Sequence, residues 1–232
     1  MKIIDNFLSK SYYNSILELL SGFKIDAPHQ SIYDFVWQYH NNITGSHLES
    51  SHFNEYGFTH SFWGEESGPV GQFGFYIQPL LFQIMDVANC DFVLRARADM
   101  VTWSKEDFTH PAHTDFPFPN SASVFYINET DGDTIFYNVE PKDVPKDKDY
   151  KDLKEYDRVS PSPNRLVLFD GDFLHTGCSP IKHKNRILIN SNYIKKKYVE
   201  SRTDGNGGNQ GFKILEEYGQ ENREAMNNVV YS

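Results

Sequence analysis

Residues 165–171 read RLVLFDG, and they give the clearest strand prediction in this chain. Four consecutive apolar residues favour a buried strand, and the Asp-Gly pair that follows is typical of a turn. Three other segments share the strand pattern: 92–101 (FVLRARADMV), in which polar and apolar residues alternate, 123–128 (SVFYIN) and 186–190 (RILIN). These segments predict a core built mainly from β-strands.

Helices are predicted ahead of most of these strands. After a short strand at 3–4, apolar residues recur at helical spacing over 10–21, between Ser9 as the expected N-cap and Gly22 as the stop. A second helix is predicted near 69–88, where the first proline would open the helix and the second would interrupt or kink it.

Several segments predict connections rather than regular core elements. Residues 26–68 mix polar residues with many aromatics, which indicates loops and short strands over a binding face, or aromatic side chains that staple the core. The Asp-Gly pair at 131–132 predicts a turn into a strand at 134–138, forming a hairpin with the preceding strand. Residues 140–158 predict an exposed insertion or mobile loop. A Gly- and Asn-rich stretch then leads to a predicted helix near 212–225.

Helices followed by six or so short strands predict a helix-buttressed β-sandwich or jelly roll. The length fits one domain over 1–232. Within it we expect helical N-terminal support at 1–90, a jelly-roll core at 91–195 and a C-terminal extension at 196–232.

Composition excludes some classes of function. The net charge of -10 argues against a general nucleic-acid binder, which needs clustered Lys and Arg. No apolar run approaches the length of a membrane span, and no signal peptide is visible. Cys90 and Cys178 lie far apart in no metal-binding spacing, so we expect free thiols in a reducing, cytoplasmic compartment. The oligomeric state is not indicated.

A candidate metal site begins at the triplet His113-Thr114-Asp115. On an extended segment, residues two apart point to the same face, so His113 and Asp115 could hold one ion. A later histidine such as His175 completes the two-imidazole, one-carboxylate set that binds non-heme Fe(II). Arg186 follows at the start of a predicted strand, where its guanidinium could bind a carboxylate bidentately. A triplet alone occurs easily by chance, so the ordered set carries the prediction.

The order of several short segments is informative. They are DNFLS at 5–9, HTD at 113–115, YIN at 126–128, GDT at 132–134, LFDG at 168–171, HTG at 175–177 and Arg186. This ordered set resembles the prolyl-4-hydroxylase-like group of iron- and 2-oxoglutarate-dependent dioxygenases. The match covers residues 1–10 and 92–194 and is silent over 26–90, 140–158 and beyond 200.

The resemblance implies a mainly β fold with flanking helices, a double-stranded β-helix of the jelly-roll or cupin-like type. It implies three iron ligands, which are also the catalytic residues: His113, Asp115 and His175. Arg186 would bind the distal carboxylate of 2-oxoglutarate, Tyr126 would bond that carboxylate or line its pocket, and Thr134 would form a pocket wall. Trp103 departs from the family, which often has tyrosine about ten residues before the first iron histidine.

The implied activity is hydroxylation of a peptidyl substrate, such as a prolyl side chain, or of a small molecule. Fe(II), 2-oxoglutarate and O2 would be used, with release of succinate and CO2. A carboxylate at Asp115 favours hydroxylation over halogenation. Two alternatives stay open: a non-enzymatic jelly-roll binding or structural module, and a cupin-like metalloenzyme that does not use 2-oxoglutarate. Only the cosubstrate enzyme requires Arg186.

Three further segments are candidates for the site or its surroundings. His47 and Glu49 form a rival metal pair without strand alternation around it. His110 is expected to be exposed before the following proline or to line the mouth of the site. The FPFP stretch at 116–119 predicts either a rigid turn or an aromatic rim over the substrate.

Overall fold

The computed structural model describes residues 1–22, 35–44, 54–65, 67–137, 153–203 and 209–214, with the backbone alone for 199–203 and 209–214. Its elements are β1 (Lys2–Ile4), α1 (Lys10–Ser21), β2 (Gln38–His40), β3 (Gly57–Gly64), β4 (Gly68–Pro69), α2 (Gly71–Ala88), β5 (Phe92–Thr102), β6 (Ser121–Tyr126), β7 (Thr134–Tyr137), β8 (Glu155–Val159), β9 (Arg165–Asp170), β10 (Leu174–Gly177), β11 (Asn185–Ile194), the 3-10 helix Lys196–Tyr198, β12 (Val199–Thr203) and β13 (Asn209–Ile214).

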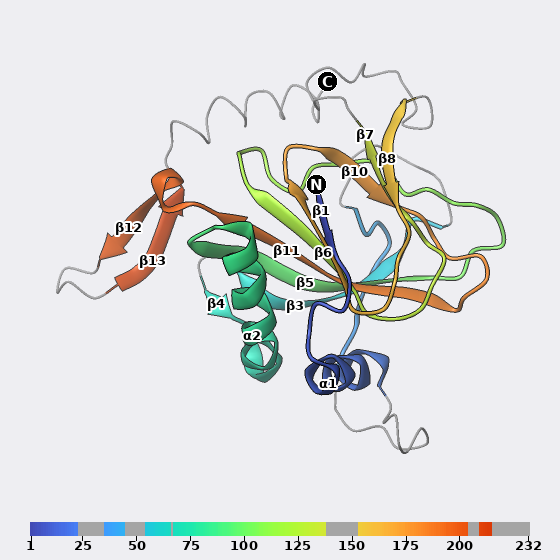
Figure 1. Cartoon of the computed structure of the whole chain (residues 1–232), viewed down its shortest axis with the longest axis horizontal. Coiled ribbons are helices and arrows are strands. Elements are labelled where there is room, and N and C mark those ends of the chain that lie inside the picture. Colours follow the sequence, from blue (N-terminus) through green and yellow to red (C-terminus); the bar gives the residue numbers. More distant parts are fainter. Residues whose placement is uncertain (23–34, 45–53, 66, 138–152, 204–208, 215–232) are drawn as a thin grey trace.

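Two antiparallel sheets form the body of the molecule (Figure 1). The larger sheet has the strand order β1-β9-β6-β11-β5-β3-β2, with β4 added beside β3, and the smaller one has the order β10-β7-β8. The helices α1 and α2 lie on the side of the large sheet away from the small sheet, and the β12–β13 pair projects from the end of β11 (Figure 1). This arrangement confirms the predicted jelly roll with flanking helices.

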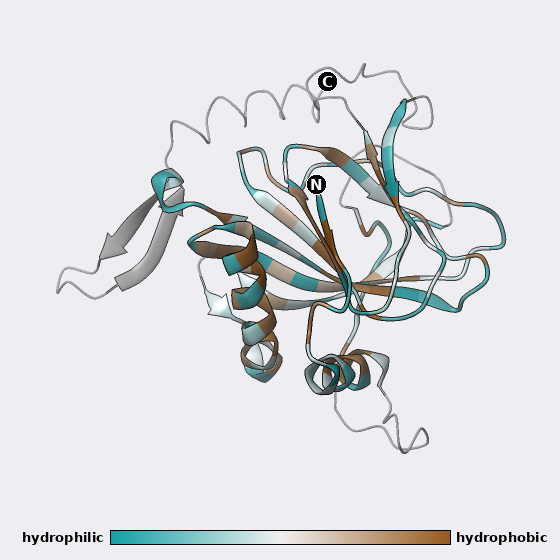
Figure 2. Cartoon of the chain, in the orientation of Figure 1, coloured by the Kyte–Doolittle hydropathy of each residue, from teal (hydrophilic) through white to brown (hydrophobic). Residues whose placement is uncertain are grey.

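Some strands contain uninterrupted runs of apolar residues because both of their faces are buried. Along β6, Phe125 packs with the helices in one core cluster, whereas Val124 and Tyr126 pack toward the small sheet in a second cluster. The same alternation separates Leu166 from Val167 in β9. In Figure 2 the central strands carry brown stretches between white and teal ones. Burial of both faces explains why the RLVLFDG segment shows no polar alternation.

The first helix forms as predicted, and the second differs in detail. α1 ends at Gly22, which adopts φ 76, and Ser9 occupies the N-cap position without a hydrogen bond from its hydroxyl to the helix. Pro69 does not open α2, because it belongs to β4 and pairs with Trp63, and the N-cap is Val70. Pro79 lies within α2 without interrupting it.

The predicted hairpin is wrong. β6 belongs to the large sheet between β9 and β11, whereas β7 belongs to the small sheet between β10 and β8. The segment between them therefore runs from one sheet to the other. Residues 129–133 form no turn, and the Asp131 carboxylate accepts hydrogen bonds from the backbone N–H groups of Ile181 and Lys182 at 3.0 to 3.2 Å. The same carboxylate contacts His183 Nδ1 at 2.8 Å.

Other predictions outside the central strands have mixed outcomes. The predicted helix near 212–225 is wrong over 212–214, which belong to β13, and its remainder lies outside the described residues. The 140–158 segment already contains the start of β8, while 138–152 and the His47–Glu49 pair lie outside the described residues. The three-part division of the domain stays a prediction.

Two chemical expectations can be compared with the structure. Cys90 and Cys178 are free thiols, as expected. Among the described residues, no helix is long and apolar enough to cross a membrane.

Asn164 joins the N-terminal segment to the sheet. It is buried, with φ 61. Its side chain accepts the Leu8 N–H at 2.9 Å and donates to the Leu8 carbonyl at 2.9 Å. Its backbone N–H donates to the Tyr126 carbonyl at 3.1 Å. One asparagine therefore connects the start of α1 to β6 and β9.

We predict that Asn164→Ala lowers the free energy of unfolding by about 3 kcal/mol, because two buried backbone groups of Leu8 lose their partners and alanine disfavours a positive φ. Asn6→Ala is the matched control, since Asn6 has φ 52 but is exposed. Its cost should be about 1 kcal/mol. Urea unfolding measures both variants, and equal losses would contradict the role assigned to the Asn164 side chain.

Candidate metal centre and cavity

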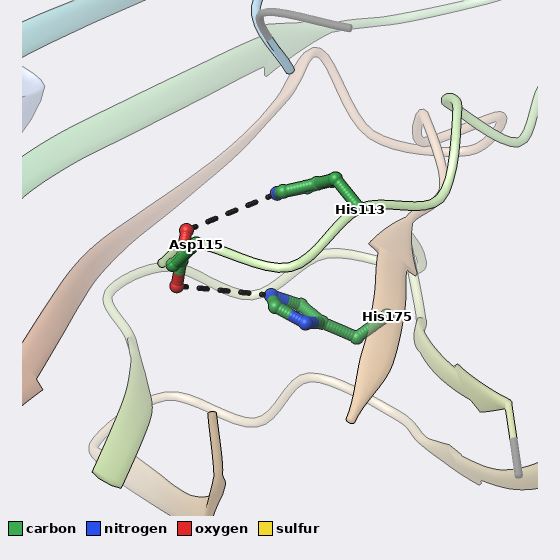
Figure 3. A group of neighbouring side chains, drawn as sticks. All are labelled: His113, Asp115 and His175. Atoms are coloured by element: carbon green, nitrogen blue, oxygen red, sulfur yellow. Dashed lines mark ion pairs between the residues drawn. The ribbon is translucent and has the colours of Figure 1, made fainter. Parts of the chain in front are cut away.

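Two backbone hydrogen bonds bring the candidate histidines together. His113, in the connection between β5 and β6, forms an isolated antiparallel bridge with His175 of β10. His113 N–H donates to the His175 carbonyl at 2.9 Å, and His175 N–H donates back to the His113 carbonyl at 3.0 Å. Asp115 follows two residues later and points toward both imidazoles (Figure 3).

The side chains of this group converge on one point. His113 Nε2 lies 3.9 Å from Asp115 Oδ1, and His175 Nε2 lies 3.9 Å from Asp115 Oδ2. One ligand atom from each of the three residues lies within 4.8 Å of the others. The spacing and the two-nitrogen, one-oxygen donor set fit a divalent transition metal held on one face.

Both imidazoles are oriented by carbonyl groups two residues earlier in the sequence. His113 Nδ1 lies 3.3 Å from the Pro111 carbonyl, and His175 Nδ1 lies 3.0 Å from the Phe173 carbonyl. A carbonyl can only accept, so each Nδ1 carries the proton and each Nε2 presents a lone pair. Burial and the neighbouring His175 lower the pKa of His113 to about 4, so its ring is neutral at pH 7. Neutral imidazole is the metal-binding form.

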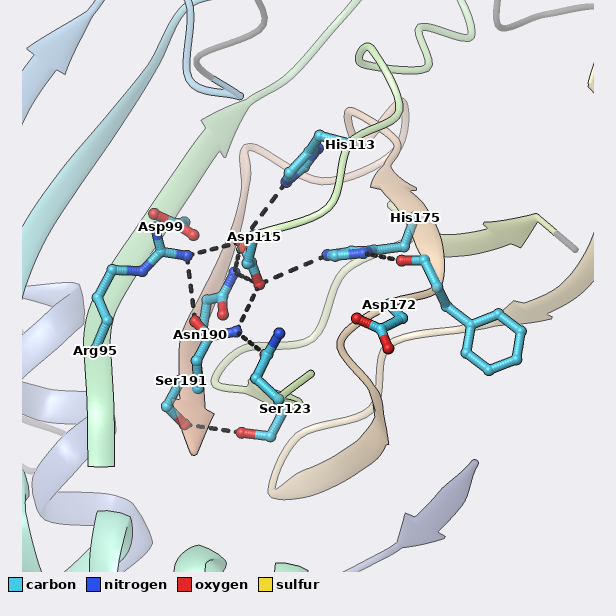
Figure 4. Close-up of polar contacts among 12 residues, drawn as sticks. Arg95, Asp99, His113, Asp115, Ser123, Asp172, His175, Asn190 and Ser191 are labelled. Atoms are coloured by element: carbon cyan, nitrogen blue, oxygen red, sulfur yellow. Dashed lines mark hydrogen bonds and ion pairs between the residues drawn. The ribbon is translucent and has the colours of Figure 1, made fainter. Parts of the chain in front are cut away.

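Asp115 is held by three side chains from the large sheet (Figure 4). Arg95 Nη2 donates to Oδ1 at 2.7 Å, and Asn192 Nδ2 donates to Oδ2 at 2.9 Å. Asn190 Nδ2 lies 3.5 Å from both oxygens. Burial would raise the pKa of Asp115, but the Arg95 guanidinium and the two imidazoles hold it well below its usual range. The carboxylate is thus ionised and fixed in direction.

A buried cation lies in the same cavity. Arg186, near the start of β11, is 6% exposed and donates from Nη2 to the Thr134 hydroxyl at 2.7 Å. That hydroxyl is 2.6 Å from the Tyr126 hydroxyl, and the guanidinium lies over the Tyr126 ring, 5.6 Å from its centroid. Within the described part of the protein, Arg186 Nε has no partner and no carboxylate pairs with this guanidinium. The arrangement leaves a desolvated positive charge to be neutralised by an anion.

Glycine makes room for the Arg186 side chain. A Cβ atom on Gly177 would lie 2.8 Å from Arg186 Nη1, and one on Gly132 would lie 2.7 Å from Arg186 Cδ. These two glycines belong to the GDT and HTG segments of the ordered set, so that set describes the packing around the guanidinium as well as the metal ligands.

One cavity connects the metal group with Arg186. Its lining includes His113, His175, Thr134 and Arg186, with Val124 and Leu188 as apolar wall residues. Tyr126 lies beneath Arg186, and Asp115 lies between the histidines. The structure therefore brings all six predicted site residues together, and their functional roles stay predictions.

The structure decides between the alternatives for two neighbouring segments and shows where Trp103 lies. His110 is not exposed: it is 3% exposed, lies 3.1 Å from the Ser179 hydroxyl through Nε2, and lines the cavity. Phe116 and Phe118 do not form a rim, because they are buried against Leu94 and Ile194. Trp103 is 53% exposed and donates from Nε1 to the Ile181 carbonyl, so it is not part of the cavity lining.

Sequence reasoning missed the polar residues that surround the predicted ones. They are Arg95, Arg97, Asp99, Asn190 and Asn192. A signal was present for the first three: the RARAD pattern in a strand places charges on one face while alanines occupy the other. The alanines Ala96 and Ala98 pack toward the helices, so the charges face the cavity side. Charged residues facing inward from a sheet indicate a polar site.

No family model matches the sequence, and no curated protein matches it with significance. Solved structures do match. An oxidoreductase of the 2OG-Fe(II) oxygenase family from Burkholderia pseudomallei has a TM-score of 0.54 and 12% identity, covering 89% of this protein and 86% of that one. The non-heme alpha ketoglutarate dependent carbocyclase SnoK from nogalamycin biosynthesis has a TM-score of 0.51 and 10% identity, covering 83% and 78%. The epimerase SnoN, in complex with Fe3+, alpha ketoglutarate and nogalamycin RO, has a TM-score of 0.51 and 11% identity over the same shares.

At these identities the similarity shows the fold. The protein has the double-stranded β-helix fold of the 2OG-Fe(II) oxygenases. The predicted fold class is confirmed, and the resemblance seen in the sequence segments is confirmed at the level of the fold.

We predict that the apo-protein binds Co(II) and that Asp115→Ala weakens this binding more than 100-fold, on the order of 3 kcal/mol, because the only anionic donor is lost. Asn192→Ala should weaken it about 10- to 100-fold, because Asp115 loses the bond that orients Oδ2. His60→Ala is the control, since His60 lies on β3 and bonds the Val36 carbonyl. Calorimetric titration measures all three, and wild-type affinity in Asp115→Ala would overturn the site.

Proposed function

We propose that this protein is an Fe(II)- and 2-oxoglutarate-dependent dioxygenase that hydroxylates its substrate. The observation that carries the proposal is the presence, in one cavity, of a two-histidine, one-carboxylate group and a buried arginine without an anionic partner among the described residues. The fold supports it, since structures of this fold include oxygenases and a complex with Fe3+ and alpha ketoglutarate.

His113, Asp115 and His175 would hold Fe(II) through Nε2, a carboxylate oxygen and Nε2. Three protein ligands on one face would leave the other positions open for the cosubstrate and O2. Bound Fe(II), with 2-oxoglutarate and O2, supplies the oxidising chemistry that inserts oxygen into a C–H bond and releases succinate and CO2. The presence of the Asp115 carboxylate favours hydroxylation over halogenation.

Arg186 would bind the distal carboxylate of 2-oxoglutarate. Its guanidinium is oriented by the bond to Thr134 and by the Tyr126 ring beneath it. The Tyr126 hydroxyl keeps its proton, because burial raises its pKa more than Arg186 lowers it. Tyr126 and Thr134 thus supply neutral hydroxyl groups next to the cation, and the anion gains both charge neutralisation and hydrogen bonds.

His110 would supply a further donor to the same anion. Its buried Nδ1 has no partner within the described residues, and Nε2 faces the Ser179 hydroxyl. Burial, together with Arg186 and His113, lowers the pKa of His110 to about 3, so the ring is neutral at pH 7. When the Ser179 hydroxyl donates to Nε2, the proton resides on Nδ1 and can bond a carboxylate.

Apolar side chains would exclude water from one wall of the cavity. Val124 and Leu188 line the cavity, and Phe169 contacts the His175 ring with centroids 4.9 Å apart. A dry wall strengthens each ion pair and hydrogen bond within the site.

The proposed substrate is a peptidyl group, such as the ring of proline, or a small free molecule. We also propose a cytoplasmic location, which the two free thiols support. A cupin-like metalloenzyme that does not use 2-oxoglutarate, or a binding module without catalysis, leaves the buried charge of Arg186 without a role.

We predict a visible charge-transfer absorption band when Fe(II) and 2-oxoglutarate are added to the apo-protein without oxygen, because chelation of the metal by the 2-oxo acid requires both the triad and the anion pocket. The band should be absent in Asp115→Ala. Anaerobic absorption spectroscopy measures it, and a wild-type protein that gives no band would rule out the proposed function.

We predict that Arg186→Gln raises the dissociation constant of 2-oxoglutarate about 30-fold or more, because loss of a buried charge partner costs roughly 2–5 kcal/mol. Co(II) affinity should change by less than about threefold. Arg158→Gln is the control, because Arg158 pairs with Glu155 on the surface of β8. Calorimetry on the Co(II)-loaded protein separates the two effects, and an equal loss of metal binding would show that Arg186 supports the metal group instead.

A further inference from the structure

A second pair of charges lines the cavity and has no task in the function proposed above. Arg97 and Asp99 lie two residues apart on β5 and both belong to the cavity lining. Across the sheet, Arg97 is level with Asn190 of β11 and Asp99 is level with Leu188. The pair therefore lies between the level of Arg186, which faces Val101, and the level of Arg95, which faces Asn192 and holds Asp115.

The pair is largely buried and incompletely bonded. Arg97 Nε lies 2.8 Å from Asp99 Oδ1, with side chains 23% and 13% exposed. These two atoms do not form a well-aligned hydrogen bond, and each has no other partner among the described residues. Burial raises the pKa of Asp99, and the Arg97 and Arg95 guanidinium groups oppose this rise. A buried ion pair with open bonding positions costs free energy unless another group completes it.

The Arg97–Asp99 pair lies in the cavity next to the metal group. Arg97 and Asp99 line the same cavity as the metal-group residues His113 and His175. Asp99 appears beside the Arg95–Asp115 contact in Figure 4. A molecule bound to the pair would have its remaining atoms next to the triad.

The charges of the cavity discriminate between two kinds of ligand. Arg186 is a cation without an anionic partner among the described residues, which suits a net anion. Arg97 and Asp99 together are neutral, so a net anion would be repelled by Asp99 and a net cation by Arg97. The matching ligand carries a carboxylate for the guanidinium and, directly beside it, an ammonium group for the carboxylate. A free α-amino acid has both groups on one carbon atom, whereas a peptide amide offers hydrogen bonds but no charge.

We propose that Arg97 and Asp99 bind the α-carboxylate and α-ammonium groups of a free amino acid, whose side chain is the group that is hydroxylated. This inference rests on the proposed function and selects the small-molecule substrate over the peptidyl one. In the reaction, a C–H bond of that amino acid's side group is replaced by C–OH with one oxygen atom of O2. The other oxygen atom enters succinate as 2-oxoglutarate loses CO2, so the substrate and 2-oxoglutarate each give two electrons to O2.

Calorimetric titration of the Co(II)- and 2-oxoglutarate-loaded protein tests the proposal without turnover. The probes are the standard free α-amino acids and their N-acetyl, C-amide counterparts. We expect at least one free amino acid to bind about tenfold or more tightly than its capped form, because capping removes both charges. Capped forms that bind as tightly as the free ones would overturn the proposal, as would the absence of binding by every free amino acid.

Variants locate the binding to the pair. Arg97→Gln/Asp99→Asn keeps size and hydrogen-bonding capacity but removes both charges, so the preference for the free over the capped form should disappear. Asp99→Asn alone should weaken the free amino acid about tenfold or more. Both variants should keep Co(II) and 2-oxoglutarate affinity within about threefold, which also shows that they are folded. An unchanged preference in the double variant would exclude the pair as the binding site.

The two proposals fail in different ways. If the wild-type protein does not bind 2-oxoglutarate, the proposed function is wrong. If it binds 2-oxoglutarate but the free amino acids show no preference over their capped forms, only the assignment of the substrate class is wrong.

Discussion

The reciprocal backbone bonds between His113 and His175 are the constraint on which the site depends. They join a connecting segment to β10, and β10 is itself anchored by pairing with β7 of the small sheet. Side chains at a bridge between paired extended segments project to the same side, so the two imidazoles are adjacent before any metal binds. Asp115 then completes the group, and residues of the large sheet fix its direction. The metal group is thus held from both sheets, by β10 through His175 and by Arg95 and Asn192 of the large sheet through Asp115.

The three arginines of the cavity differ in how far their charges are compensated. Arg95 is bonded to Asp115 and Asn192, and its charge serves to orient a carboxylate. Arg97 is paired with Asp99 but leaves bonding positions open. Arg186 has hydroxyl and aromatic partners and no anion among the described residues. Nε of all three arginines lacks a hydrogen-bond partner among the described residues, but only Arg186 also lacks a carboxylate partner there. In the proposals above, Arg95 orients a metal ligand, Arg97 binds part of a zwitterion and Arg186 binds an anion.

Residue spacing pointed to residues that the structure brings together, because a metal group of this kind is encoded in short, local patterns; their roles stay predictions. The triplet at 113–115, the second histidine and the strand that begins near Arg186 all lie where such patterns placed them. The hairpin of β6 with β7 was wrong for a physical reason: an Asp-Gly pair favours a turn locally, but both faces of β6 are buried and its edges pair with β9 and β11. The sequence left open whether His110 is exposed or lines the site, because its contact with Ser179 joins residues 69 positions apart. Contacts between residues so far apart cannot be predicted from a local pattern. The inward-facing charges of β5 could have been predicted, because the RARAD segment alternates charged residues with alanine.

The pairing of β1 with β9 determines when the large sheet can be completed. Lys2, Ile3 and Ile4 pair with residues 166–168, so one edge of the sheet joins the first residues of the sequence to a strand made much later. α1 needs only local hydrogen bonds and can form quickly, but closing so long a loop is slow and entropically costly. During synthesis, β1 can therefore pair only after β9 has been made. Asn164 directly precedes β9, so its hydrogen bond to Leu8 can form at the same stage. The strand that is synthesised first is therefore among the last to pair in this sheet.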